Sequence, residues 1–362
     1  MSDTLTSSSD KTIYDAIEKA ASTDFANAVF QIANLSPTLV SELQSFEKGN
    51  KLTLSTSGSY SAGYYQNANT IAISGFSNDP ATLIHSPDLA SGGIGIGTTA
   101  SALVGTLAHE LGHYEDKDYP NFVTTIGLSS SDPVNELLYV AYALIGEGKA
   151  HYNAVEVYSE IEANSRALKG GSINGNTLID PDNKSADMQK DYNSIIDTTT
   201  EADAIAASTV IYARLNPSLK GEGISSNYIQ YYGNAWLSQF TTPASGSVPA
   251  LLTDVGLKMS VDNSSTIKLD FLNQQGLANV SLTITNGVNL LQSGIGEAGP
   301  ARGIKGQVKL TLALAPIVVR SSSPVLGAAK KRSTPLTAVP STTRPPLRRF
   351  ISNRSSTRAS AA

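Results

Sequence analysis

The residues best suited to chemistry in this sequence are His109, Glu110 and His113, which form the pattern H-E-x-x-H. Two histidines four positions apart lie on the same face of a helix, where their imidazoles can bind one zinc ion. The glutamate directly after the first histidine can act as general base for a water molecule that the metal activates. The spacing therefore predicts a helix that carries two zinc ligands and one catalytic carboxylate, Glu110.

The apolar residues of this helix indicate which side faces the protein core. We expect the helix to run from about residue 98 to residue 116. At 100° per residue His109 and His113 lie nearly opposite its apolar stripe, and Glu110 lies between the histidine pair and the stripe. The stripe consists of Ala100, Leu103, Leu107 and Leu111. A structural histidine should lie in or beside such a stripe, so the pattern favours metal ligands over two solvent-facing histidines.

A catalytic zinc needs a third protein ligand and an open position. The chain contains no cysteine, so the third ligand must be a histidine or a carboxylate. In metzincins a glycine and a histidine follow three and six residues after the second histidine, where this sequence has Asp116 and Tyr119. The metzincins are therefore excluded.

Two glutamates of a later predicted helix, at about residues 147–168, remain as candidates for the third ligand. Glu147 falls on the apolar face of that helix, where a carboxylate is costly unless it is paired or bound to metal. Glu160 falls on the polar face and has solvent exposure as its simpler explanation. We therefore prefer Glu147 and keep Glu160 as the alternative.

The segment that contains the preferred ligand reads Glu147-Gly-Lys-Ala-His-Tyr152. It resembles the E-G-x-A-x-Y segment that follows H-E-x-x-H in gluzincins, the zinc peptidases that include thermolysin-like enzymes and zinc aminopeptidases. The resemblance covers about residues 50–170 and implies that Glu147 is the third zinc ligand. It further implies a zinc metallopeptidase that cleaves peptide bonds, with Thr70–Ser74 as an edge strand that pairs with extended substrate.

Peptide hydrolysis of this kind also needs a donor that stabilises the developing oxyanion, commonly a tyrosine or a histidine. No spacing argument chooses among the available residues. They are Tyr152, His151, Tyr228, Tyr231 and Tyr232. His151 follows Glu147 by four positions and is also a candidate to hold that carboxylate in place.

Hydrophobic periodicity predicts an α+β protein that is mostly helical, with a small β-sheet before the H-E-x-x-H helix. Together with the resemblance, this implies a zincin-like core. We predict two or three helices in 11–47, further helices at 134–145, 147–168, 186–196, 200–215 and 226–239, and strands at 51–55, 70–74, 266–271, 280–285 and 307–312.

Composition divides the chain into regions of different character. Residues 1–241 carry a net charge of −15 and residues 242–362 carry +10, within a total of −5. We expect a disordered N-terminus (1–10), a metallopeptidase-like domain (11–241), a linker (242–249), a β-rich region (250–320) and a basic disordered tail (321–362).

The remaining sequence features bear on location and partners. The N-terminus lacks the basic start and apolar run of a standard secretory signal, and no stretch approaches the roughly 18 apolar residues of a membrane helix. We expect a soluble protein, either cytoplasmic or exported without a signal peptide. In the second case it resembles the metallopeptidase-like effectors and toxins that bacterial secretion systems export.

Proteins, peptides and peptidoglycan peptides all suit the predicted chemistry as substrates. The alternative from another functional class is a non-catalytic binding or structural protein whose basic tail contacts anionic surfaces. The tail has no recognisable nucleic-acid-binding motif, so we expect no specific nucleic-acid partner.

Overall fold

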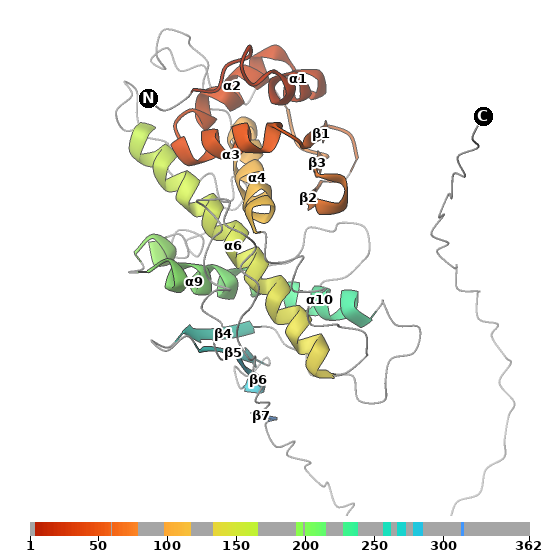
Figure 1. Cartoon of the computed structure of the whole chain (residues 1–362), viewed down its shortest axis with the longest axis vertical. Coiled ribbons are helices and arrows are strands. Elements are labelled where there is room, and N and C mark those ends of the chain that lie inside the picture. Colours follow the sequence, from red (N-terminus) through yellow and green to blue (C-terminus); the bar gives the residue numbers. More distant parts are fainter. Residues whose placement is uncertain are drawn as a thin grey trace, which may run out of the picture. The chain divides into compact units, whose positions relative to one another are not determined.

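The computed structural model describes residues 4–58, 60–78, 98–116, 133–165, 193–197, 200–214, 227–237, 256–261, 266–272, 278–284 and 313–314. Contacts divide the chain into two compact units, residues 1–316 and 317–362, and all described residues belong to the first. In the labels of Figure 1, the helices are α1 (Lys11–Ala20), α2 (Thr23–Ala33), α3 (Pro37–Glu47), α4 (Thr98–Glu115), α6 (Pro133–Ser165), α9 (Glu201–Arg214) and α10 (Tyr228–Leu237), with a 3-10 turn at Gln66–Ala68. The strands are β1 (Lys51–Ser55), β2 (Ser61–Tyr65), β3 (Thr70–Ser74), β4 (Gly256–Val261), β5 (Ile267–Leu272), β6 (Ala278–Ile284) and β7 (Ala313–Leu314).

Helices α2 and α3 have clear local start signals. The hydroxyl of Ser22 accepts a hydrogen bond from the backbone N–H of Phe25 at the start of α2. Ser36 caps α3 in the same way, and Pro37 occupies the first turn, where its missing N–H has no cost. The prediction of two or three helices in residues 11–47 is confirmed.

The segment before α1 differs from its prediction. Residues 1–10 were expected to be disordered, but Leu5 is buried among the helices. Its backbone N–H and C=O both bond to the side-chain amide of Asn34. One apolar anchor and a pair of hydrogen bonds therefore fix the described part of this segment.

The first sheet has the strand order β1-β3-β2, with β1 parallel and β2 antiparallel to β3. The predicted strands 51–55 and 70–74 are confirmed. The second was expected to be an edge strand, and that expectation is wrong. Thr70–Ser74 is the central strand, with Ile71 and Ile73 buried. Among the described strands, the one with an open edge nearest to α4 is β2, which lacks the regular apolar alternation that identified its neighbours.

Helix α6 is one continuous element from Pro133 to Ser165, although two separate helices were predicted. Gly146 and Gly148 both lie in the interior of this helix. A glycine costs only about 1 kcal/mol in a helix interior relative to alanine, and burial along the helix outweighs that cost. The predicted start at Pro133 is confirmed.

The described residues form two apolar clusters, and α6 contributes to both. The first cluster joins the second half of α6 to α1–α4 and the first sheet. The second joins the first half of α6 to α9, α10 and the second sheet, whose order is β4-β5-β6-β7 with antiparallel pairing.

The second sheet packs against helices within the same unit. Leu257 of β4 and Leu269 of β5 share a cluster with Ile205 of α9. The described part of region 250–320 is β-structured, as predicted, and β4 adds a strand that was not predicted. The linker 242–249, the strand 307–312 and the basic tail lie outside the described residues.

The fold is thus mostly helical with two small sheets, which agrees with the predicted α+β class. No helix in the described part of the chain is long and apolar enough to cross a membrane.

Candidate metal centre

Three of the predicted site residues meet where α4 crosses α6. Oε2 of Glu147 lies 3.3 Å from Nε2 of His109 and 3.4 Å from Nε2 of His113. The possible ligand atoms of the three residues lie within 4.8 Å of one another. The alternative ligand, Glu160, takes no part in this group.

The donor set fits a zinc ion. Zinc is held by histidine nitrogen and carboxylate oxygen at about 2.0–2.1 Å, so two ligands of a tetrahedral site stand about 3.3–3.4 Å apart. The two distances from Glu147 to the histidines match that separation. The buried Oε2 atom has no hydrogen-bond partner among the described residues, which leaves its lone pairs available to a cation.

Two glycines allow the three helices to approach one another closely at this point. A Cβ on Gly112 would lie 2.6 Å from the Cα of Ala150, where α4 meets α6. A Cβ on Gly148 would lie 2.8 Å from the Cα of Thr209, where α6 meets α9. Gly148 and Ala150 are the small residues of the Glu147 segment, so their role here is to let α4 and α9 contact α6.

Glu110 lies beside the three candidate ligands and is 5% exposed. Burial raises the pKa of its carboxyl, an effect that His109, His113 and a hydrogen bond from the backbone of Tyr64 partly offset. Its buried Oε2 atom has no hydrogen-bond partner among the described residues. The carboxyl is therefore more basic than an exposed glutamate and has an oxygen available for a proton.

The charges of the candidate ligands stabilise one another. Burial opposes the charged form of His113, but Glu147, Glu110 and Asp116 raise its pKa to about 9. Burial likewise opposes ionisation of Glu147, yet His113 and His109 hold the pKa of that carboxyl well below its usual range. Opposite charges at this distance in a buried site explain both shifts.

Tyrosines of α9 and α10 contact the same group. Tyr232 donates a hydrogen bond to Oε1 of Glu147. The ring of Tyr212 stacks on that of His109, with centroids 5.1 Å apart and planes 14° apart. Its hydroxyl lies 3.3 Å from Nε2 of His109 and accepts a long, 3.5 Å hydrogen bond from Tyr228.

Tyr212 was not among the predicted donors. It belongs to no motif, and its place near the end of α9 gave no signal in the sequence. The site forms only when Gly148 lets α9 approach α6. Burial raises the pKa of the Tyr212 hydroxyl well above its ordinary value, so the group stays protonated and can donate.

The structure separates the five predicted donor candidates. Tyr232 contacts Glu147, whereas Tyr228 contacts Tyr212. Tyr231 packs against the rings of Tyr228 and Tyr232. His151 is buried against the ring of Tyr212, and burial together with His109 lowers its pKa to about 3. Tyr152 instead packs against both apolar clusters.

Glu160 is not part of the candidate ligand group and instead contacts residues at the start of α3. One of its oxygens accepts hydrogen bonds from the Ser36 hydroxyl and the Thr38 backbone, and the other accepts one from the Thr38 hydroxyl. The carboxylate therefore ties α6 to the start of α3, where negative charge is favoured by the helix dipole.

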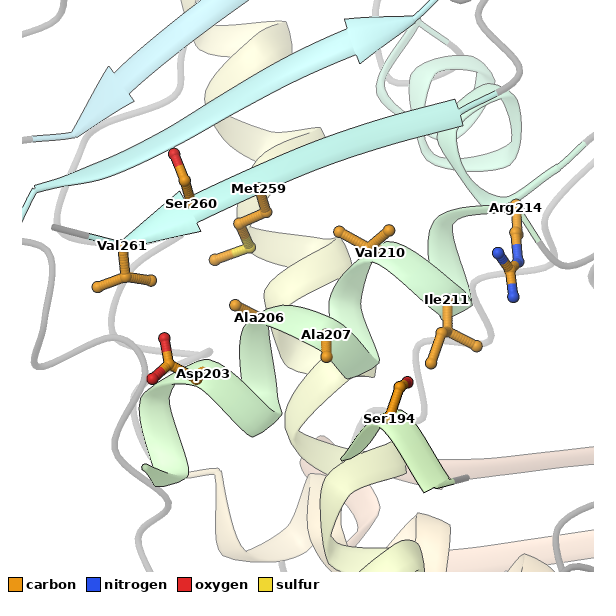
Figure 2. A pocket seen from close by; sticks show the side chains of 10 residues that line it. All are labelled: Ser194, Asp203, Ala206, Ala207, Val210, Ile211, Arg214, Met259, Ser260 and Val261. Carbon is orange, nitrogen blue, oxygen red and sulfur yellow. The ribbon is translucent and has the colours of Figure 1, made fainter. Parts of the chain in front are cut away.

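A cavity separate from the metal-ligand group lies between α9 and β4 (Figure 2). Its volume is about 350 Å³, and its described lining mixes apolar side chains with the polar residues Ser194, Asp203, Arg214 and Ser260. None of the candidate ligands lines it. Ile211 of its lining belongs to the first apolar cluster, and Met259 and Val261 pack against the second.

Comparison with known proteins gives no relative from which a role could be transferred. No protein-family model, no curated protein and no solved structure matches this chain.

Proposed function

We propose that this protein is a zinc-dependent peptidase that hydrolyses peptide bonds. The observation that carries the proposal is the meeting of His109, His113 and Glu147, in which both distances from Glu147 to the histidines suit a tetrahedral zinc site. A three-ligand His₂Glu set leaves a position open, which is the arrangement of catalytic rather than structural zinc.

A bound zinc ion would make water more acidic and polarise the substrate carbonyl. Glu110 would take the proton from that water, because it is buried beside the ligands and one of its oxygens has no hydrogen-bond partner among the described residues. Its raised pKa makes it a better proton acceptor. The same carboxyl can then transfer the proton to the leaving amine.

Tyr212 is the best-placed donor for the oxyanion. Because Tyr228 donates to the Tyr212 oxygen, the Tyr212 proton is left to point elsewhere. In the present arrangement that proton can reach Nε2 of His109. When this nitrogen binds metal its lone pair is no longer available, and the proton can go to the substrate oxygen instead.

The open edge of β2 is the natural place for an extended peptide. The backbone of Tyr64 partly offsets the raised pKa of Glu110, so this residue of β2 lies beside the proposed general base. In an antiparallel strand, backbone N–H and C=O groups on the same side belong to every second residue. Those of Ala62 and Tyr64 therefore point to the same side of β2. A peptide added to this edge would run past the general base.

Metal analysis tests the ligand set. Purified wild type should contain about one zinc per chain, and His109→Ala and Glu147→Ala should lose it. Glu160→Ala is the matched control, and it should retain zinc although it loosens the start of α3. Zinc retained in Glu147→Ala but lost in Glu160→Ala would move the ligand role to Glu160, and a wild type that binds no zinc would refute the proposal.

Product analysis tests the activity. Wild type and Glu110→Gln are incubated with a peptide library and with peptidoglycan, and the products are identified by mass spectrometry. Glu110→Gln should bind zinc and form no products. Glu115→Gln, the same change on the same helix, should cleave as wild type does. Zinc binding without any wild-type products would favour the non-catalytic alternative.

A further inference from the structure

Glu42 is a buried acid that the proposed mechanism does not use. It lies in the middle of α3 and is 5% exposed. Its Oε2 atom accepts a hydrogen bond of 3.2 Å from the side-chain amide of Asn153 on α6. Its buried Oε1 atom has no hydrogen-bond partner among the described residues.

The orientation of the Asn153 amide is fixed by its surroundings. Nδ2 lies 2.9 Å from the carbonyl oxygen of Ala108 on α4, which can only accept a hydrogen bond. The nitrogen must therefore face Ala108, and its second hydrogen goes to Glu42. The amide oxygen, Oδ1, is buried and also lacks a partner among the described residues.

Among the described residues, two buried oxygens thus lack a donor, one on Glu42 and one on Asn153. An ionised Glu42 could only accept hydrogen bonds, so both oxygens would stay buried without a donor, which destabilises the folded state. A single proton on Oε1 removes this difficulty, because the acid O–H can donate to Oδ1 while Oε2 accepts from Nδ2. A carboxylic acid and a primary amide are complementary in this way.

We propose that Glu42 is held as a neutral carboxylic acid that pairs with Asn153, and that this buried acid–amide pair joins α3, α4 and α6 behind the metal-ligand group. Asn153 acts as the centre of the junction, since one amide nitrogen contacts both Glu42 and the carbonyl directly before His109. The proposal does not depend on metal binding or catalysis.

The electrostatic surroundings favour the neutral form. Burial raises the pKa of Glu42 to about 8, against a smaller opposing effect of the Asn153 hydrogen bond. The charged groups that act on it from the packed helices are Glu115 of α4 and Glu156 and Glu160 of α6, all of them acidic. The negative charge of each neighbour makes the ionised form of Glu42 more costly.

A proton held only by the folded state makes stability depend on pH. Between the ordinary pKa of 4.5 and about 8, the folded chain keeps a proton that the unfolded chain releases. Rising pH therefore favours unfolding over this window, and the equilibrium constant of unfolding rises by up to about tenfold per pH unit. Above about pH 8 both states are ionised and the dependence ends.

The experiment compares urea unfolding of the full-length wild type and Glu42→Gln from about pH 5 to pH 9, in chelator so that metal binding adds no proton release. Glutamine can donate to Oδ1 and accept from Nδ2, so Glu42→Gln should fold and should lack the pH dependence due to Glu42. The equilibrium constant of unfolding of the wild type, divided by that of Glu42→Gln, should rise by up to about tenfold per pH unit until about pH 8. Glu47→Gln, on the same helix, should keep the wild-type profile.

Infrared spectroscopy gives a second readout that a purely structural role would not change. At neutral pH the wild type and Glu47→Gln should show the carbonyl stretch of a protonated carboxylic acid, and Glu42→Gln should lose that band. Parallel pH profiles for wild type and Glu42→Gln, or no such band, would show an ionised Glu42 and overturn the proposal. So would a Glu42→Gln chain that is unstable at pH 6.

Discussion

Gly112 of α4 lies against Ala150 of α6 so closely that an added Cβ would stand 2.6 Å from the Ala150 Cα. Gly112 directly precedes His113 in the sequence, and Ala150 follows Glu147 by three residues. The separation of the two helices at Gly112 therefore sets the separation of the candidate metal ligands. Backbone atoms rather than the end of a flexible side chain oppose the added Cβ, so the helices themselves would have to move.

Gly112→Ala should accordingly lower both stability and metal affinity. Overpacking of a close-packed core costs about 1–3 kcal/mol, and a helix shift moves His113 away from Glu147. We expect a free energy of unfolding reduced by about that amount in urea titrations, and weaker zinc binding in competition with a chromophoric chelator. Gly49→Ala is the control, because a Cβ there meets nothing within 4 Å. Equal behaviour of the two variants would contradict the role of the Gly112 contact.

Tyr212→Phe should lower turnover while leaving zinc in place. The variant keeps the ring that stacks on His109 and removes only the hydroxyl. Loss of one oxyanion donor costs about 10²–10³-fold in kcat, with a smaller change in KM. Steady-state kinetics on a peptide found in the library digestion would measure both constants. Tyr152→Phe removes a hydroxyl from the apolar clusters and should keep kcat, so a similar loss in both variants would count against Tyr212.

The candidate ligands could be predicted from the sequence because each of them carried a local signal. Spacing on one helix places His109 beside His113, and the apolar stripe of α4 is buried as the periodicity predicted. Glu147 was singled out as a charged residue on an apolar face, and the structure places it 7% exposed beside both histidines.

The features that sequence reasoning missed depend on contacts between distant segments. Tyr212 reaches His109 only because Gly148 admits α9, and nothing near residue 212 signals that approach. The open edge belongs to β2, whose residues Ser61–Tyr65 lack apolar alternation, so periodicity pointed to β3 instead. The pairing of Glu42 with Asn153 joins residues 111 positions apart, which no short pattern can reveal.

Tyr232→Phe should weaken zinc binding without abolishing it. The hydroxyl of Tyr232 donates to Oε1 of Glu147 and so orients Oε2 toward the histidines. Removal of such a supporting hydrogen bond typically costs about 10–100-fold in metal affinity. Chelator competition at fixed pH would measure the change, with Tyr152→Phe again as control. Unaltered affinity would mean that packing alone orients Glu147.

Lys149→Met should destabilise the protein because it leaves a buried charge without its partner. Lys149 Nζ lies 2.9 Å from Oδ1 of Asp116, and both side chains are 6% exposed. Breaking a buried ion pair from one side costs about 3–5 kcal/mol, whereas replacing both partners costs less, so adding Asp116→Asn should recover part of the loss. Lys11 forms the corresponding pair with Asp15 at the surface, and Lys11→Met should leave the unfolding midpoint nearly unchanged. If Lys149→Met proved as mild as Lys11→Met in urea unfolding, water would have to reach Asp116, and the ion pair would not hold the end of α4 against α6.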